Sequence, residues 1–326
     1  KSRYVKTIVT NSPLEAAAFI KNVGTVAFPT ETVYGLGANV FDAEAVAKIF
    51  EAKRRPADNP LIAHVANLAQ IRELASEVKE NARNFIDALF PGPLTLVLPK
   101  SDRVPLIATA GLDTIGVRMP RHELAQRFLE ACGVPVVAPS ANLSGRPSPT
   151  TWQAVLEDLD GRINCILQGE ATEIGLESTV VDCTSKVPVL LRQGAVSLAE
   201  LQAVVAETVE NKVVNGRAVR SPGLMHRHYS PRAKVVLIDH GSESPNLRSE
   251  NSAYLGLRRP KCEFKKALLC SSVEIYAHVV FEFFRECDRE SVDTIYCEIV
   301  PESGIGAALM DRLRRAAEGE RHESKD

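Results

Sequence analysis

The sequence predicts an α/β fold in which a large mixed sheet is followed by a smaller α/β domain. Short runs rich in β-branched residues alternate with segments of helical periodicity from about Tyr4 to Val205, and a second alternating series begins near Lys234. Some neighbouring strands, such as those around Leu94 and Thr114, have too little chain between them for a crossover helix. We therefore expect an open, twisted, mixed sheet rather than a purely parallel one.

The elements of the first part alternate along the chain. Helices are predicted after Pro13, after Asp42, which is a plausible N-cap, and after Arg121. The predicted strands are TVAFPT (25–30), LTLVLP (94–99), TIGVRM (114–119), VPVVAPS (134–140) and STVVDC (178–183).

The second part has the pattern of a small Rossmann-like α/β domain of the doubly wound type. Its predicted strands are KVVLID (234–239), KKALLC (265–270) and DTIYCEIV (293–300), and helices are expected from about Val273 and Ile305. A Gly-, Pro- and Ser-rich stretch precedes it, without any Asp or Glu from Asn211 to Ile238. We predict a first domain over residues 1–206, a basic linker over 207–234 and a small C-terminal domain with a polar tail over 235–326. The linker is either a solvated tether or a segment that docks on something anionic.

Composition excludes several classes of function. A net charge of -2 and a pI near 6.5 give no global attraction to nucleic acid or to an anionic membrane, so any affinity for phosphate must be local. The seven cysteines include no C-x-x-C pair, as expected for reduced thiols. No apolar run reaches the roughly 18–20 residues of a membrane helix, and no signal peptide precedes the first predicted strand. We expect a cytoplasmic protein without a membrane partner.

Three adjacent cations, Lys53, Arg54 and Arg55, stand at the predicted end of the helix that begins after Asp42. Basic residues in a last turn commonly complement the helix dipole. Lys53, however, lies on the same stripe as Ile49 and Phe50, which must face the interior, and a buried lysine is costly unless an anion meets it. Lys53 and Arg55 are therefore candidates for an anion site.

Hydroxyl, amide and guanidinium side chains recur where the predicted strands end. Each of them is commonly a turn residue that bonds only the backbone. Together they suit a nucleoside triphosphate beside a small carboxylate, with transfer chemistry that needs alignment and charge neutralisation. Mg²⁺ would arrive on the phosphates, as it commonly does. No obvious metal triad, phosphate-binding P-loop or complete G-x-G-x-x-G is present, so side chains and irregular loops would hold the phosphates. The residues are Thr30, Thr32, Asn59, His64, Thr114, Arg118, Ser140, Asn142, Ser144, Ser148, Ser178, Thr179 and Arg192.

Several longer segments resemble the YrdC-like family in order and spacing. They are FPTETVYGLG, KRRPADNPL, PGPLTLVL, GVRMPRH, APSANLSGRPSPT, ESTVVD and LLRQG. SPGLMHRHYSP and IGAALMDRLRRAA further resemble the two-domain branch, the threonylcarbamoyl-AMP synthases. The resemblance implies a YrdC-like mixed sheet. It also implies synthesis of L-threonylcarbamoyladenylate and pyrophosphate from L-threonine, bicarbonate or CO2, and ATP. The product would feed a tRNA threonylcarbamoyl transferase complex that modifies the adenosine next to the anticodon, with any tRNA contact indirect.

The resemblance also implies roles for individual residues. Lys53 and Arg55 correspond to paired catalytic cations on the ATP phosphates. Tyr229 belongs to a linker segment that closes over the nucleotide, which matters because a carbamoyl adenylate hydrolyses readily. The other nucleotide-binding positions are Asn59, Thr114, Ser140, Ser148 and Arg192. The threonine-binding positions are Thr32, His64, Arg118, Ala138 and Ser178.

Other functions remain open on the sequence. The chain could be an RNA- or tRNA-binding module, although its charge is near neutral and its basic loops lack interleaved aromatic residues. It could also be a paralogue that binds nucleotide without synthase activity. A carbamoyl-transfer role like that of hydrogenase maturation proteins is disfavoured, because their cysteine pairs are absent here.

Overall fold

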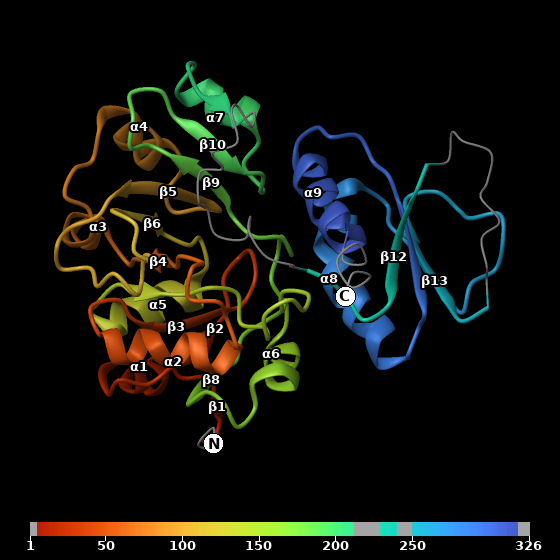
Figure 1. Ribbon diagram of the computed structural model, residues 1–326, viewed down its shortest axis with the longest axis horizontal. Helices are drawn as coiled ribbons and strands as arrows, with labels where there is room; N and C mark the ends of the chain where they lie inside the picture. The colour runs from red at the N-terminus through yellow and green to blue at the C-terminus, as the bar shows by residue number, and fades with distance from the viewer. Residues whose placement is uncertain (1–4, 212–228, 240–249, 319–326) are drawn as a thin grey trace, which may run out of the picture.

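The computed structural model describes residues 5–211, 229–239 and 250–318, and it contains the two α/β domains that the sequence predicts (Figure 1). The helices of the first domain are α1 (Pro13–Lys21), α2 (Ala43–Lys53), α3 (Leu68–Leu74), α4 (Glu80–Leu89), α5 (Glu123–Cys132), α6 (Trp152–Leu159) and α7 (Leu198–Val204). Its strands are β1 (Ile8–Thr10), β2 (Val26–Phe28), β3 (Gly35–Asn39), β4 (Ile62–His64), β5 (Leu94–Pro99), β6 (Thr114–Arg118), β7 (Val136–Val137), β8 (Cys165–Leu167), β9 (Thr179–Asp182), β10 (Val189–Arg192) and β11 (Val209–Glu210). The second domain contains β12 (Lys234–Ile238), β13 (Ser252–Gly256), β14 (Lys266–Leu269), α8 (Val273–Arg289), β15 (Thr294–Glu298) and α9 (Ile305–Ala317).

The first domain is built on one eleven-stranded mixed sheet, as expected. Its strand order is β1-β8-β2-β3-β7-β4-β6-β5-β9-β10-β11. β4 runs parallel to β6 with His64 opposite Arg118, whereas β5 runs antiparallel to β6. The register of β4 and β6 brings two predicted threonine-binding residues side by side at one end of adjacent strands.

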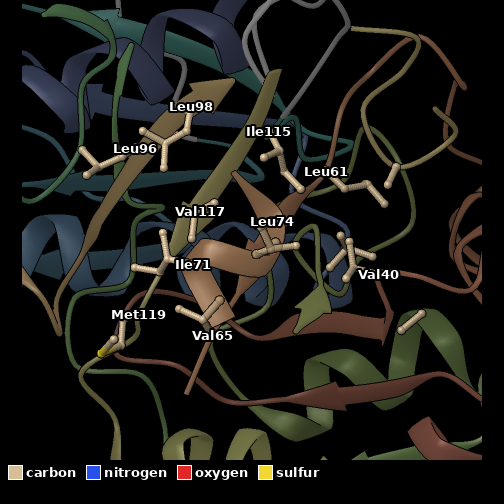
Figure 2. Close-up of a cluster of buried hydrophobic side chains, with 14 of the residues drawn as sticks. Val40, Leu61, Val65, Ile71, Leu74, Leu96, Leu98, Ile115, Val117 and Met119 are labelled. Carbon is tan, nitrogen blue, oxygen red and sulfur yellow. The ribbon is translucent and has the colours of Figure 1, made fainter. Parts of the chain in front are cut away.

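Packing on the sheet fixes the positions of these strands. Figure 2 shows the cluster in which Leu96 of β5 and Val117 of β6 meet Ile71 and Leu74 of α3, all buried. Side chains of a strand alternate between the two faces of its sheet, so burying Ile115 and Val117 sets the orientation of every residue of β6. The hydrophobic core therefore determines where the β6 side chains point.

The second domain has a four-stranded parallel sheet in the order β12-β15-β13-β14. Val235, Leu255 and Cys297 pack with α8 and α9, whereas Tyr254 and Tyr296 form a cluster on the opposite face. Among the described residues both helices thus cover one face of the sheet, whereas a doubly wound sheet carries helices on both. Figure 1 shows α8 and α9 between this sheet and the first domain.

The connection between the domains is described only in part. β11 pairs with β10 and so extends the large sheet to Glu210, past the predicted boundary at residue 206. β12 begins at Lys234. Most of the predicted linker, residues 212–228, and the polar tail from residue 319 lie outside the described residues. Within the described ranges, no helix is both long and apolar enough to cross a membrane.

Candidate active site

The cationic segment Lys53–Arg55 lies at the C-terminal end of helix α2. The Asp42 side chain caps its N-terminus by accepting hydrogen bonds from the backbone N–H groups of Glu44 and Ala45. Arg54 ends the helix in the left-handed conformation, with φ 52°, and its side chain is exposed. Lys53, the last residue of the helix, is buried, and Arg55 is half-buried.

Lys53 is buried, and its partners among the described residues are backbone carbonyls. Its Nζ donates hydrogen bonds of 2.5 Å to the carbonyl oxygens of Ser140 and Asn142, both in the loop after β7. Burial, and then the neighbouring Arg55, hold the Lys53 pKa well below its usual value. Lys53 does not line the cavity described below. Its two hydrogen bonds hold the loop after β7 in place, and we call this contact the Lys53 brace.

Most of the predicted binding residues line one cavity of about 70 Å³. Four arginines line it, Arg55, Arg118, Arg146 and Arg192, against a single carboxylate, Glu177, among the described lining residues. Such an excess of cations suits an anionic ligand. The lining also includes Thr30, Thr32, His64, Ala138, Ser140, Asn142, Ser148, Ser178 and Tyr229.

Arg55 points into the cavity from the segment after α2. Its Nε donates to the carbonyl of Asn59 at 3.3 Å and its Nη2 to that of Pro60 at 3.2 Å. Burial lowers the Arg55 pKa to about 10, with Tyr229 opposing and Arg192 adding to the shift. Arg55 is thus a cation at neutral pH, held in one geometry by the Asn59–Pro60 backbone.

A second group of side chains surrounds Arg118 at the end of β6. Arg118 Nη2 lies 2.7 Å from Glu31 Oε2, and Arg118 Nη1 donates to Thr32 Oγ1 at 2.7 Å. Burial alone would raise the pKa of Glu31, but Arg118 and the backbone N–H of Arg121 outweigh it, so that pKa lies below its usual value. Arg118 is therefore oriented by an ion pair while part of its guanidinium still faces the cavity.

His64 stands beside Arg118 as a neutral imidazole. Burial first, and then the positive charge of Arg118, lower its pKa to about 3. Its Nδ1 is buried and accepts no hydrogen bond from the described residues. The ring packs edge-on against Phe28, with centroids 5.7 Å apart. His64 can accept a hydrogen bond from a ligand N–H or O–H near Arg118.

The loop after β7 forms another wall of the cavity. Ser140 Oγ donates to Asn142 Oδ1 at 2.6 Å, and Asn142 Nδ2 donates to the carbonyl of Arg146 at 2.9 Å. Further along, Ser148 Oγ donates to Glu177 Oε1 at 2.5 Å. Side-chain bonds within the loop and the Lys53 brace beneath it thus hold its hydroxyl groups in fixed positions.

Arg192 and Ser178 meet at the edge of the cavity near β9 and β10. Arg192 donates through Nε and Nη2 to the carbonyl oxygen of Ser178, at 3.1 and 2.9 Å. Gly194 passes so close to this segment that a Cβ there would lie 2.2 Å from the backbone nitrogen of Thr179. The glycine of LLRQG therefore permits the close approach that joins Arg192 to Ser178.

Not every predicted position reaches the cavity. Thr114 is at the opposite end of β6 from Arg118, paired with Pro99, and does not line the cavity. Asn59 is buried behind Arg55 and contributes its carbonyl group. The sequence-based prediction missed Arg146 and Glu177 as lining residues. Both stand within segments already singled out, APSANLSGRPSPT and ESTVVD, but neither position alone indicated that it faces the cavity.

Tyr229 brings the end of the linker to the cavity. Its backbone is left-handed, with φ 66°, and its ring stacks on Phe281 of α8 with centroids 5.4 Å apart. The next residue, Ser230, donates its backbone N–H to the carbonyl of Gly145 at 3.0 Å. This segment thus contacts the second domain and the loop after β7 at once.

The fold and the cavity define a class of protein: a two-domain α/β protein with a cationic site that suits a phosphorylated ligand. Residues 18–194 match the Sua5/YciO/YrdC family, described as telomere recombination, and residues 196–318 match the C-terminal domain of threonylcarbamoyl-AMP synthase. The chain belongs to the Sua5/YciO/YrdC family.

Similar proteins match across both domains. The threonylcarbamoyl-AMP synthase of Pyrococcus abyssi is 46% identical over 319 residues, 93% of each chain. That of Bacillus subtilis is 40% identical and covers 95% of this chain and 94% of its own. The crystal structure of P. abyssi Sua5 complexed with L-threonine superposes with a TM-score of 0.86 at 42% identity and covers 96% of this chain and 97% of its own.

Proposed function

We propose that this protein synthesises L-threonylcarbamoyladenylate from L-threonine, bicarbonate or CO2, and ATP, with release of pyrophosphate. The observation that carries the proposal is the cavity, in which an Arg118–Thr32–His64 corner adjoins a cluster of cationic side chains. Relatives named threonylcarbamoyl-AMP synthase match nearly the whole chain, which favours the synthase over an RNA-binding module or an inactive paralogue.

The corner around Arg118 would hold the amino acid. A guanidinium has five N–H donors, and those of Arg118 that are not used on Glu31, Thr32 and the Gly92 carbonyl can take a carboxylate. Glu31 keeps the guanidinium in place, which reduces the entropic cost of binding. Ala138 and Ser178 line the same cavity and would enclose the rest of the amino acid.

The proposed reaction has two steps, formation of a carbamate and transfer of the adenylyl group. The threonine ammonium group loses one proton to become an amine, and its nitrogen loses a second as it bonds to the carbon of CO2, which gives a carbamate; both protons pass to solvent. A carbamate oxygen then attacks the α-phosphorus of ATP, and the bond from that phosphorus to the pyrophosphate oxygen breaks. With a pKa of about 3, His64 is too weak a base to store the amine proton at neutral pH, so it orients the amine by accepting a hydrogen bond.

The cationic side chains would hold the triphosphate. Arg192 is buried and Arg55 is half-buried at the cavity wall, and preorganised charges of this kind stabilise charge that develops during phosphoryl transfer. Lys53 acts indirectly, through the carbonyls of Ser140 and Asn142. The described residues contain no cluster of metal-ligating side chains, so Mg²⁺ would be held by the phosphates and neutralise their charge.

Substrate entry requires a wider cavity. At about 70 Å³ it is well below the roughly 300–1,000 Å³ of typical ligand pockets. Tyr229 is the lining residue of the linker segment, so its displacement would open the site and its return would exclude water. The sequence-based proposal that this segment closes over the nucleotide is consistent with that position.

The experiment that tests the function is incubation of the purified protein with ATP, Mg²⁺ and bicarbonate, with and without L-threonine. We expect threonine-dependent pyrophosphate and a product with the mass of threonylcarbamoyl-AMP. ATP binding without threonine-dependent turnover would contradict the proposal. In the cell the product would pass to a tRNA threonylcarbamoyl transferase complex, in the cytoplasm, without direct need for tRNA contact.

A further inference from the structure

Two arginines of the second domain are buried against carboxylates of the first. Arg285 of α8 and Arg312 of α9 have side chains only 1% exposed. Arg285 Nη2 lies 3.0 Å from Asp158 Oδ2, and Arg312 Nε lies 3.0 Å from Glu177 Oε2. Buried charges are expensive unless paired, and each of these carboxylates receives a counter-charge from the domain opposite.

The Arg312 pair leads directly to the cavity. Glu177 shares its two oxygens, since Oε2 accepts from Arg312 Nε and Oε1 accepts from Ser148 Oγ at 2.5 Å. Glu177 and Ser148 both line the cavity, whereas Arg312 does not. Arg312 therefore contacts Glu177 directly and Ser148 only through Glu177. It also lies over the ring of Tyr229, another lining residue, 5.3 Å from the ring centroid.

The contact between Arg312 and Glu177 affects ligand binding because Glu177 is a carboxylate in the cavity lining. An uncompensated carboxylate in the lining would repel a triphosphate and would be free to change its hydrogen bond to Ser148. Arg312, which also pairs with Asp311 at 2.7 Å, opposes both effects, because its charge offsets that of Glu177 and its Nε fixes one of the Glu177 oxygens. The Ser148 hydroxyl, predicted to bind the nucleotide, is then held in one orientation.

A second pair acts on the same loop. Asp158 Oδ2 accepts from the backbone N–H of Leu143 at 3.1 Å, and its Oδ1 accepts from Arg146 Nη1 at 2.5 Å. Arg285 Nη2 also donates to the carbonyl of Pro147 at 2.5 Å. The loop between β7 and α6 is thus tied to the second domain near both Leu143 and Ser148.

We propose that the second domain completes the nucleotide site, with Arg312 as a positioning residue that acts on Ser148 and on the ligand's phosphates through Glu177. The inference rests on the proposed function, since it takes ATP as the ligand. It assigns the second domain a direct part in nucleotide affinity.

Calorimetric titration of the full chain with Mg-ATP tests the inference. Arg312→Gln is expected to raise the Kd for ATP at least about tenfold, and to raise the KM for ATP more than that for threonine. Arg312→Gln/Glu177→Gln should recover much of the lost affinity, because the uncompensated charge is then gone. Arg314→Gln is the matched control: Arg314 stands on the same helix, 46% exposed and paired with Glu302, and its loss should leave the Kd unchanged.

The outcomes separate the possible failures. If wild-type protein binds ATP and Arg312→Gln binds it equally well, the positioning role is wrong while the synthase stands. If wild-type protein neither binds ATP nor forms product, the proposed function fails and this inference with it. Should Arg312→Gln not fold, Arg312→Lys, which keeps the charge but not the Nε geometry, is expected to bind ATP several-fold more weakly. Wild-type affinity in Arg312→Lys would overturn the inference.

Discussion

At the scale of single residues, the site depends on side chains that are oriented before a ligand arrives. Arg118 is held by Glu31, Thr32 and the Gly92 carbonyl, and His64 is held neutral beside it. Each of these contacts restricts the side chain before binding, so less conformational entropy is lost when the ligand binds. Preorganisation of this kind makes conservative substitutions informative, because they keep the charge and change the geometry.

Arg118→Lys should raise the KM for threonine about tenfold or more and leave the KM for ATP within about twofold. An ammonium cannot bind Glu31, Thr32 and a substrate carboxylate in the planar arrangement of a guanidinium. Steady-state kinetics with each substrate varied in turn measure the split. Arg121→Lys, at a neighbouring exposed position, is the control. Equal increases in the KM for threonine and the KM for ATP would show that Arg118 does not bind the amino acid specifically.

His64 should make the folded protein sensitive to acid. The pKa of His64 is about 3 in the folded state, against 6.5 for an ordinary histidine. Below about pH 6.5, His64 therefore binds a proton in the unfolded chain but stays neutral in the folded one, which favours unfolding. The resulting stability is complete above about pH 6.5 and is lost progressively toward pH 3.

His64→Gln is therefore expected to flatten the fall in the free energy of unfolding between about pH 6.5 and pH 4.5, above the range in which carboxylates titrate. Urea unfolding at several pH values measures it. His278→Gln, in the second domain, serves as the comparison. The same pH slope in His64→Gln and wild-type protein would show that the pKa of His64 is the same in the folded and the unfolded state.

At the scale of elements, the end of α2 and the loop after β7 form one unit. Lys53 joins them through the carbonyls of Ser140 and Asn142, and the backbone N–H of Ser144 returns a hydrogen bond to the Lys53 carbonyl at 3.0 Å. The loop is therefore held in part by a residue of a different element.

Lys53→Met, which keeps most of the side-chain volume, should lower kcat/KM for ATP about 10²-fold or more. It should also destabilise the fold by about 1–3 kcal/mol, because two buried carbonyls lose their donor. Kinetics and thermal unfolding on the same preparation measure the two effects. Arg54→Asn, at the exposed left-handed position next to it, is expected to change neither. Wild-type kinetics in Lys53→Met would contradict the bracing role.

At the scale of the whole molecule, the two domains share charges across their contact. Asp158 and Glu177 in the first domain are paired with Arg285 and Arg312 in the second, and Tyr229 packs on Phe281. The large sheet nevertheless has its own hydrophobic clusters, formed within residues 16–205. Folding of the first domain and formation of its complete site are therefore separable.

Truncation after Asn211 should leave a folded first domain that binds ATP weakly. The cut retains β11, which pairs with β10 beside Arg192, and removes Arg285 and Arg312, the second-domain partners of Asp158 and Glu177. Circular dichroism and calorimetric titration with Mg-ATP measure the two properties. Full ATP affinity in the fragment would mean that the second domain contributes nothing to the nucleotide site, whereas an unfolded fragment would mean that the first domain needs the second to fold.

The sequence by itself determined the alternation of strands and helices, the Asp42 cap, the end of α2 before Pro56 and the gathering of polar residues at strand ends. These features follow from local periodicity and turn chemistry, which neighbouring residues carry. It also contained the motifs by which the family resemblance was identified.

Only the tertiary structure decided which charge meets which partner. Lys53, predicted as a candidate for an anion site, donates to the carbonyls of Ser140 and Asn142, 87 and 89 positions away. Glu177 meets Arg312 across 135 positions, and neither position carries a local signal of the other. Thr114 belongs to a motif strand, yet the direction of β6 takes it away from the cavity. Such pairings depend on how whole elements pack, because electrostatic partners are set by distance in space and not by spacing along the chain.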